Sequence, residues 1–148
     1  ERYLADDDCS VSMWTRASEL DPERADSWFY IGQHWRLAQV YRQAISFLSK
    51  SVKIEKPPRS MFQWEYLYDC LRHIELARAV YFSDDAKGKD WKAAKKSLRI
   101  ALNTCNQGDR QEMERMLDKA SEALRAHKAA KEREKEAEQA REAEAEQA

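Results

Sequence analysis

The chain has 148 residues, of which 36% are charged and 43% hydrophobic, and its formal net charge is −1. This length fits one domain with a modest core, and the balanced charge excludes a global attraction to nucleic acid or to an anionic membrane surface. Because the chain has only three glycines and three prolines, it lacks the turn residues of an all-β protein, and we expect an all-α fold.

The cysteines give a first expectation about the compartment. Cys9, Cys70 and Cys105 are widely spaced and contain no Cys-x-x-Cys pair, so neither a zinc site nor a disulfide framework is indicated. We expect small, reduced core residues and a cytoplasmic protein. No apolar run approaches the roughly 20 residues that span a bilayer, and no signal-peptide pattern is found. The chain opens with Glu1 rather than Met, which suggests a piece of a larger protein.

Three segments in chain order carry the same helical stripe, with steps of four, three and three residues. They are Ser10, Trp14, Ala17, Leu20; then Ala44, Leu48, Ser51, Ile54; then Ala94, Leu98, Ala101, Thr104. Such steps keep side chains on one helix face. The first two stripes are offset by 34 residues, a spacing that is typical of helical repeats.

Other helices are expected between these stripes. Their apolar faces are Trp28, Ile31, Gly32, Trp35 and, 36 residues later, Trp64, Leu67, Tyr68, Leu71. The linker 56–60 contains two prolines, which cannot continue a helix, and Ser60 is a candidate N-cap for the helix that follows.

These residues resemble a tetratricopeptide repeat (TPR). The resemblance rests on Trp28-x-x-Ile31-Gly32-x-x-Trp35 followed by Tyr41, Ala44, Leu48, Ser51 and Pro57; it is specific over 23–57 and degenerate elsewhere. It implies a right-handed stack of antiparallel helix hairpins, an α-solenoid, over 1–126. Gly32 and Ala44 would be small because the paired helices cross closely there.

The second hairpin is longer than the first. We expect helices over 59–83 and 87–105, joined by the polar turn 83–88, with a tip that projects about 10 Å beyond its neighbour. A sixth helix begins near Asp109 with an apolar stripe of Met113, Met116, Leu117, Ala120 and Leu124. The Ala/Glu/Lys-rich tail 127–148 is expected to be a solvated helical or disordered extension; a partner-bound coiled coil is the alternative, although its heptads lack Leu, Ile and Val.

No catalytic pattern is found, and we expect a protein without enzymatic activity, metal or cofactor. Gly32, Gly88 and Gly108 are isolated, so they form no phosphate-binding loop. The three histidines lack the spacing of a metal site, and no serine has the surroundings of a nucleophile elbow.

Two surfaces are candidates for binding a protein or peptide partner. The inner face of the stack, which lines the groove in TPR proteins, is predicted to present Asp26, Phe29, Gln33, Arg36, Leu37, Phe62, Glu65, Asp69, Arg72 and His73. Two arginines one repeat apart suit an extended acidic peptide; the alternative is that these are ordinary surface residues. TPR proteins that bind chaperone tails clamp a carboxylate with Lys and Asn, and here Phe29, Gln33 and Tyr66 stand instead, so we do not expect that specificity.

The second surface is a basic stripe on the fifth helix. It consists of Lys92, Lys95, Lys96 and Arg99, with Lys87 and Lys89 at the helix start. It could meet phosphate or an acidic partner, but no aromatic residues interleave the lysines, which disfavours nucleic acid.

The leading hypothesis is a non-catalytic protein–protein interaction or scaffold module. The alternative is that residues 26–33 and 62–68 are similar to helical repeats at the C-terminus of some bacterial and phage family 2 glycosyltransferases. The chain would then be an accessory region that aids assembly or acceptor docking. A third hypothesis is self-association through an apolar edge around Trp14.

Overall fold

The computed structural model describes residues 2–57, 65–105 and 109–148, and within them the protein is all-α, as expected. Its elements are α1 (Arg2–Leu20), α2 (Ala25–Leu37), α3 (Tyr41–Lys53), the π-helical segment η1 (Leu67–Leu71), α4 (Arg72–Phe82), α5 (Gly88–Thr104) and α6 (Arg110–Gln147). Among the described helices, none combines the length and the apolar character that crossing a membrane requires.

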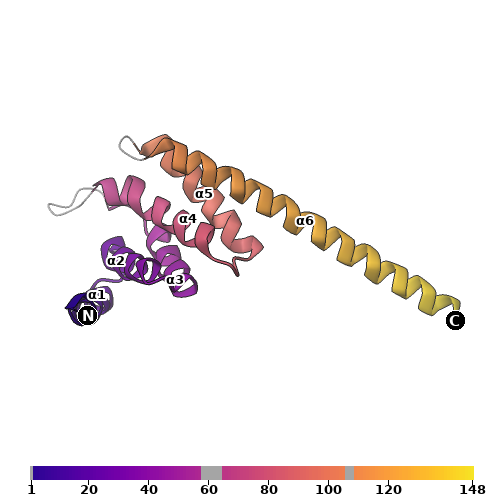
Figure 1. The fold of residues 1–148 in the computed structure, drawn as a ribbon, viewed down its shortest axis with the longest axis horizontal. Coiled ribbons are helices and arrows are strands. Elements are labelled where there is room, and N and C mark those ends of the chain that lie inside the picture. Colours follow the sequence, from indigo (N-terminus) through magenta and orange to yellow (C-terminus); the bar gives the residue numbers. More distant parts are fainter. Residues whose placement is uncertain (1, 58–64, 106–108) are drawn as a thin grey trace.

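The helices pack in sequential pairs (Figure 1). α2 packs against α3, α4 against α5 and α5 against α6, while α3 also contacts α4 and so joins the first hairpin to the second. α1 packs on α2 at the N-terminal edge. Neighbours in sequence are thus neighbours in space, and this arrangement supplies each amphipathic helix with a partner for its apolar face.

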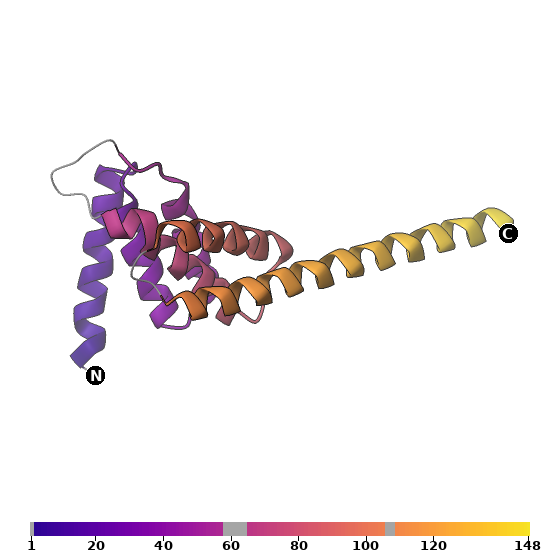
Figure 2. The same ribbon diagram turned by 90° about the horizontal axis from the view of Figure 1, so that it is seen from above.

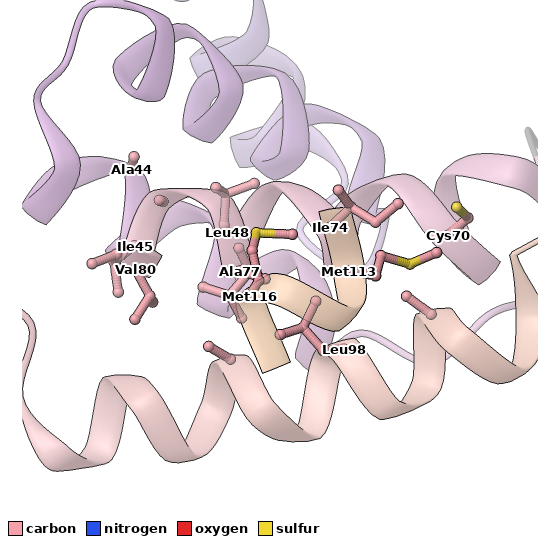
Figure 3. Packing of buried hydrophobic residues seen from close by; sticks show 14 of the residues in the cluster. Ala44, Ile45, Leu48, Cys70, Ile74, Ala77, Val80, Leu98, Met113 and Met116 are labelled. Carbon is pink, nitrogen blue, oxygen red and sulfur yellow. The ribbon is translucent and has the colours of Figure 1, made fainter. Parts of the chain in front are cut away.

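The core runs between α3, α4, α5 and the first turns of α6 (Figure 3). Ala44, Leu48 and Leu98 are fully buried, as the stripes predicted. The predicted close crossing of α2 and α3 is also confirmed, because a Cβ on Gly32 would lie 2.5 Å from Leu48 Cγ. A larger residue at this position would require Leu48 or one of the two helices to shift.

The stripe predicted on α1 is wrong in part. Trp14 is half-buried and stacks on Tyr30 with ring centroids 5.4 Å apart, but Leu20 is 72% exposed. The buried position in the last turn is instead Ser18, whose hydroxyl donates to the carbonyl of Thr15 at 2.7 Å. Among the described elements α2 is the main packing partner of α1, so much of the α1 surface stays exposed.

The second hairpin ends where the sequence predicted, but its tip does not project. Arg42, the second residue of α3, pairs with Asp85 in the turn at 3.3 Å, and Tyr41 stacks on Phe82 with centroids 6.4 Å apart. The tip of the second hairpin therefore lies level with the start of α3. Ser60 and Trp64, a predicted N-cap and a predicted core residue, lie outside the described residues.

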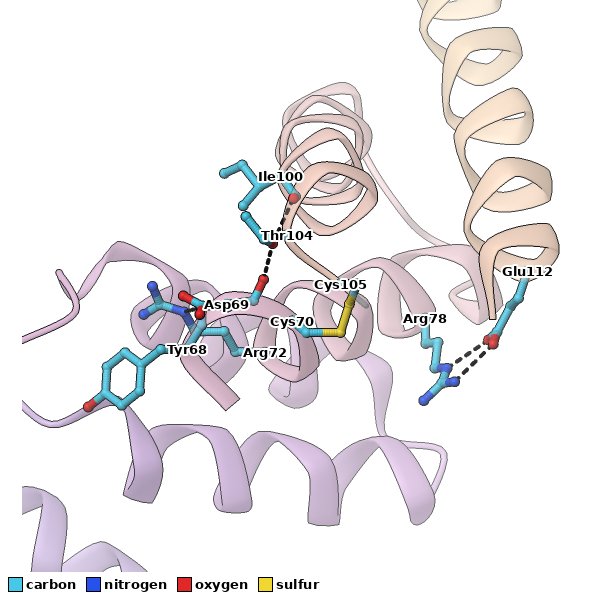
Figure 4. The surroundings of a disulfide bond; sticks show 9 residues. All are labelled: Tyr68, Asp69, Cys70, Arg72, Arg78, Ile100, Thr104, Cys105 and Glu112. Carbon is cyan, nitrogen blue, oxygen red and sulfur yellow. Dashed lines mark hydrogen bonds and ion pairs between the residues drawn. A yellow bond between two sulfur atoms is a disulfide. The ribbon is translucent and has the colours of Figure 1, made fainter. Parts of the chain in front are cut away.

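The expectation of reduced cysteines is wrong for two of the three. Cys70 in η1 and Cys105 at the end of α5 form a disulfide (Figure 4). Cys9 is free and exposed. The partners are 35 residues apart, and only the return of α5 along η1 brings them together. A disulfide is uncommon in a reducing compartment, so the cysteines no longer support the expectation of a cytoplasmic location.

α6 begins as predicted and then leaves the body. Asp109 is its N-cap, with a side chain that accepts a hydrogen bond from the Glu112 amide at 3.1 Å, and Met113, Met116 and Ala120 are buried. Beyond Leu124 the helix continues into solvent to Gln147 (Figure 2), where all of 125–148 except the half-buried Ala129 is exposed. We call residues 125–148 the arm.

Candidate partner-binding surfaces

Three of the side chains predicted to face a partner on the inner face are buried in the described structure. Phe29 is 1% exposed and lies in the core rather than facing a partner, because α2 uses Ala25 and Phe29 as well as Ile31 to cover its neighbours. Arg72 and His73 are 7% and 4% exposed. These three side chains are therefore corrected from surface to interior, and Phe62 lies outside the described residues.

Arg72 is buried because it binds backbone carbonyls at the junction of the two hairpins. Its guanidinium donates to the carbonyls of Tyr68 at 2.9 Å, Ser51 at 2.7 Å and Ile54 at 2.6 Å. The last two carbonyls are at the end of α3, where a helix leaves acceptors without partners. Burial lowers the pKa of Arg72 from its usual value. The residue is a cap for α3 and is not accessible to an acidic ligand.

Tyr68 and Ser51 form hydrogen bonds with the backbone at the start of α2, in the same region. The Tyr68 hydroxyl accepts a hydrogen bond from the Ala25 amide at 3.0 Å, and the Ser51 hydroxyl donates to the Ala25 carbonyl at 3.1 Å. Ser51 is fully buried. The Ser51 hydroxyl gives the buried Ala25 carbonyl the hydrogen-bond donor that it needs away from water.

Arg36 and His73 also have internal partners. Arg36 forms an ion pair with Glu75 and keeps 18% of its side chain exposed. His73 Nδ1 lies 3.3 Å from Ser97 Oγ. Burial lowers the pKa of His73 to about 4, and the Arg72 charge acts in the same direction. The pair of His73 and Ser97 does not form an accessible catalytic site, since both side chains are buried.

The remaining members of the predicted face are more exposed but scattered. Glu65 is 76% exposed, and Asp69 is 41% exposed and pairs with Lys56 at 3.0 Å. Asp26 pairs with Arg24 at 2.8 Å, while Gln33 is half-buried. The residues of the predicted inner face that stay accessible are mainly acidic. Arg36 and Arg72, the two arginines that suggested an acidic ligand, have internal partners and do not form one accessible site.

A different surface gathers the positive charge. A groove of about 830 Å³ follows the outer side of α5 and reaches Leu124 of α6. We call it the α5 groove; it is lined by Lys89, Lys92, Ala93, Lys95, Lys96, Arg99, Ile100, Asn103 and Leu124. Ala93, Ile100 and Leu124 provide an aliphatic floor, and four lysines with one arginine give the lining a charge of +5.

The cations of the α5 groove form no ion pair within the part of the chain that the structure describes. Within the described residues, no carboxylate forms an ion pair with any of the five, whereas Arg36, Arg42 and Arg78 all do. Lys92 and Lys96 are one helical turn apart, as are Lys95 and Arg99, and like charges at this spacing destabilise a helix slightly. The groove is thus set to attract negative charge from outside the domain.

A second groove, of about 590 Å³, adjoins the first between α3 and α5. Lys89 and Ala93 line both, and Lys50 and Lys53 of α3 extend the positive charge across it. Its carboxylate, Asp90, is occupied by Arg42 at 3.0 Å and by the Lys87 amide at 2.9 Å. The two grooves make one basic face on the second helix of each hairpin.

The sequence indicated part of this face. The lysine stripe on the fifth helix was predicted, but the contributions of α3 and Leu124 were not, because they depend on how three helices are placed side by side. The alternation of Lys50 and Lys53 with buried Leu48 and Ser51 was the available signal for the α3 contribution.

The described residues contain no group of three or more His, Cys, Asp or Glu side chains that could hold a metal ion. The chain matches no protein-family profile and no curated protein.

Proposed function

We propose that the protein is a non-catalytic protein–protein interaction module of TPR type, and that it binds an acidic protein partner through the α5 groove. The observation that carries the proposal is the combination of an aliphatic floor with five cations that have no carboxylate partner among the described residues. Exposed apolar surface that is rimmed by polar residues is typical of sites that bind other proteins.

The helix arrangement supports the TPR-type, solenoid part of this proposal. The pairs α2–α3 and α4–α5 follow one another, and Gly32 meets Leu48 where the resemblance implies a close helix crossing. A repeat stack exposes long helix faces and grooves, and proteins of this architecture use them to bind other proteins.

A protein partner fits the groove better than nucleic acid does. Single-stranded nucleic acid is usually held by aromatic side chains that stack on bases, and the groove lining contains none. Its apolar residues are aliphatic, as expected for contact with the side chains of an amphipathic helix. The accessory-region hypothesis for a glycosyltransferase stays a prediction, and no feature of the described residues favours it.

Affinity purification of tagged protein from its native cells tests the proposal. We expect Lys92→Glu/Lys96→Glu to lose the partner that the native protein recovers in stoichiometric amount. Arg16→Glu is the control, since it reverses a cation on α1 that is 72% exposed and lines neither groove, and it should keep that partner. Equal recovery by the native protein and the groove variant would exclude the groove, and an RNase-sensitive partner would exclude a direct protein contact.

A further inference from the structure

The distal half of the arm is the chemical counterpart of the α5 groove. Residues 136–147 contain five glutamates and one arginine, which give a net charge of −4, against +5 for the groove lining. Glu134, Glu138, Glu142 and Glu146 follow one another at single-turn spacing and form no ion pair with a described residue. Such a row repels itself along the helix, so a cationic partner would stabilise the arm.

The arm and the α5 groove also have complementary apolar surfaces. Ala137 and Ala145 lie beside the glutamate row on the helix surface, and small side chains let a helix approach closely. The groove floor of Ala93, Ile100 and Leu124 offers the complementary apolar strip. The length matches as well: residues 136–147 span about 16 Å as a helix, and the groove from Lys89 to Asn103 follows about 21 Å of α5.

The arm cannot reach the groove of its own chain. α6 is one continuous helix from Arg110 to Gln147, and Figures 1 and 2 both show the arm running away from the body. Folding back would require breaking the helix. A second copy of the chain can supply the arm without that cost.

The way in which α5 lies along α6 would let each of two copies place its arm in the groove of the other. A Cβ on Gly88 would lie 3.7 Å from His127 Cγ, so the start of α5 lies where the arm begins, and α5 runs antiparallel to the first part of α6. If two copies of α6 lie antiparallel with a two-fold axis near Lys131, each distal arm reaches the groove of the other copy. A two-fold contact of this kind closes into a dimer and does not polymerise.

We propose that this chain forms an antiparallel two-fold dimer in which residues 136–147 of each copy occupy the α5 groove of the other. The inference deepens the proposed function, on which it rests, by naming the acidic partner as a second copy of the chain. It predicts an association that weakens with salt, since the Debye length falls from about 10 Å at 0.1 M to about 3 Å at 1 M ionic strength.

Sedimentation equilibrium with charge-reversed variants tests the dimer. The groove variant Lys92→Glu/Lys95→Glu/Lys96→Glu changes the charge of the groove lining from +5 to −1, and the arm variant Glu138→Lys/Glu142→Lys/Glu146→Lys changes the charge of residues 136–147 from −4 to +2. At about 0.1 M ionic strength the native chain should be dimeric, and each variant alone should be monomeric because its own groove and arm then carry like charge. Mixed in equal amounts, they should form a heterodimer, since both of its contacts join opposite charges.

The chain that carries all six substitutions is the internal control. Its groove is acidic and its arm basic, so it should dimerise again with the native net charge, which shows that the single variants are not simply misfolded. A native chain that stays monomeric at about 0.1 M ionic strength, or a mixture that forms no heterodimer, would overturn the inference. A native monomer that still loses a captured partner through Lys92→Glu/Lys96→Glu would leave the proposed function standing, whereas a native monomer with unchanged capture would remove both.

Discussion

Arg36 on α2 and Glu75 on α4 form a bidentate ion pair across 39 positions of the sequence. The Glu75 carboxylate is 2% exposed and also accepts a hydrogen bond from Arg78 at 2.9 Å. Arg78 in turn donates to both Glu112 carboxylate oxygens, at 2.7 and 2.9 Å. This chain of alternating charges joins the first hairpin to α6 through α4. The ion pair of Arg36 therefore links α2 to α4.

Removing the Glu75 charge should destabilise the fold. In Glu75→Gln, Arg36 and Arg78 lose their shared buried carboxylate, and we expect the free energy of unfolding to fall by about 3 kcal/mol. Urea denaturation measures the change. Glu65→Gln is the control, since Glu65 is 76% exposed and lies 3.9 Å from Lys56; it should change stability by less than about 0.5 kcal/mol. Equal effects of the two substitutions would contradict a structural role for the network.

Acid should weaken the fold through His73. The unfolded chain takes up a proton near pH 6.5, but the buried imidazole does so only near pH 4, so the unfolded state binds more protons between these values. The free energy of unfolding should therefore fall by about 3 kcal/mol as the pH drops from about 7 to about 4. The contribution is fully present above pH 6.5 and lost by pH 4.

His73→Asn separates this effect from other titrations. Asparagine can keep a hydrogen bond to Ser97 and cannot titrate, so urea denaturation of this variant should show a flatter pH dependence between 6.5 and 4. His127→Asn, at an exposed position of the arm, should keep the native slope. An unchanged slope in His73→Asn would show that the buried imidazole does not control the acid response.

Breaking the disulfide should cost stability without changing the helix pairing. The bond between Cys70 and Cys105 closes a loop with a sequence separation of 35, for which chain entropy predicts a contribution of about 3–4 kcal/mol. Thermal unfolding of Cys70→Ser/Cys105→Ser should show that loss, and a reductant should lower the native protein to the same level. Cys9→Ser should have little effect, because Cys9 is free and exposed. Reductant-insensitive native protein would argue against the bond.

The two described glycines with close neighbours should respond oppositely to alanine. A Cβ at position 32 would lie 2.5 Å from Leu48 Cγ and 3.1 Å from the Leu48 amide nitrogen, so Gly32→Ala must move α2 against α3. We expect a net loss of about 1–2 kcal/mol, because overpacking outweighs the gain in helix propensity. Gly88→Ala meets only ordinary contacts with His127 and should be neutral or slightly stabilising. Chemical denaturation of both variants checks the contrast.

Much of the helix pattern could be predicted from local sequence. Periodicity found Ala44, Leu48 and Leu98 as core residues, and the composition around Asp109 located the start of α6. These features depend on the spacing of side chains along one helix, which is fixed at about 3.6 residues per turn. The candidate groove was less predictable. Arg36 and Arg72 were assigned to one exposed face because they lie off the apolar stripes of their helices, but the carboxylate and carbonyls that they bind are distant in sequence.

What the sequence determined by itself is the set of amphipathic helices, the small residue where α2 and α3 cross, and the charge of each helix face. Tertiary structure alone decided that Cys70 meets Cys105, that Arg72 caps α3, and that the lysines of α5 share a groove with Leu124. The reason is physical. Helix formation depends on residues three or four positions apart, whereas disulfides, buried ion pairs and grooves depend on the relative placement of helices that only the packed core fixes.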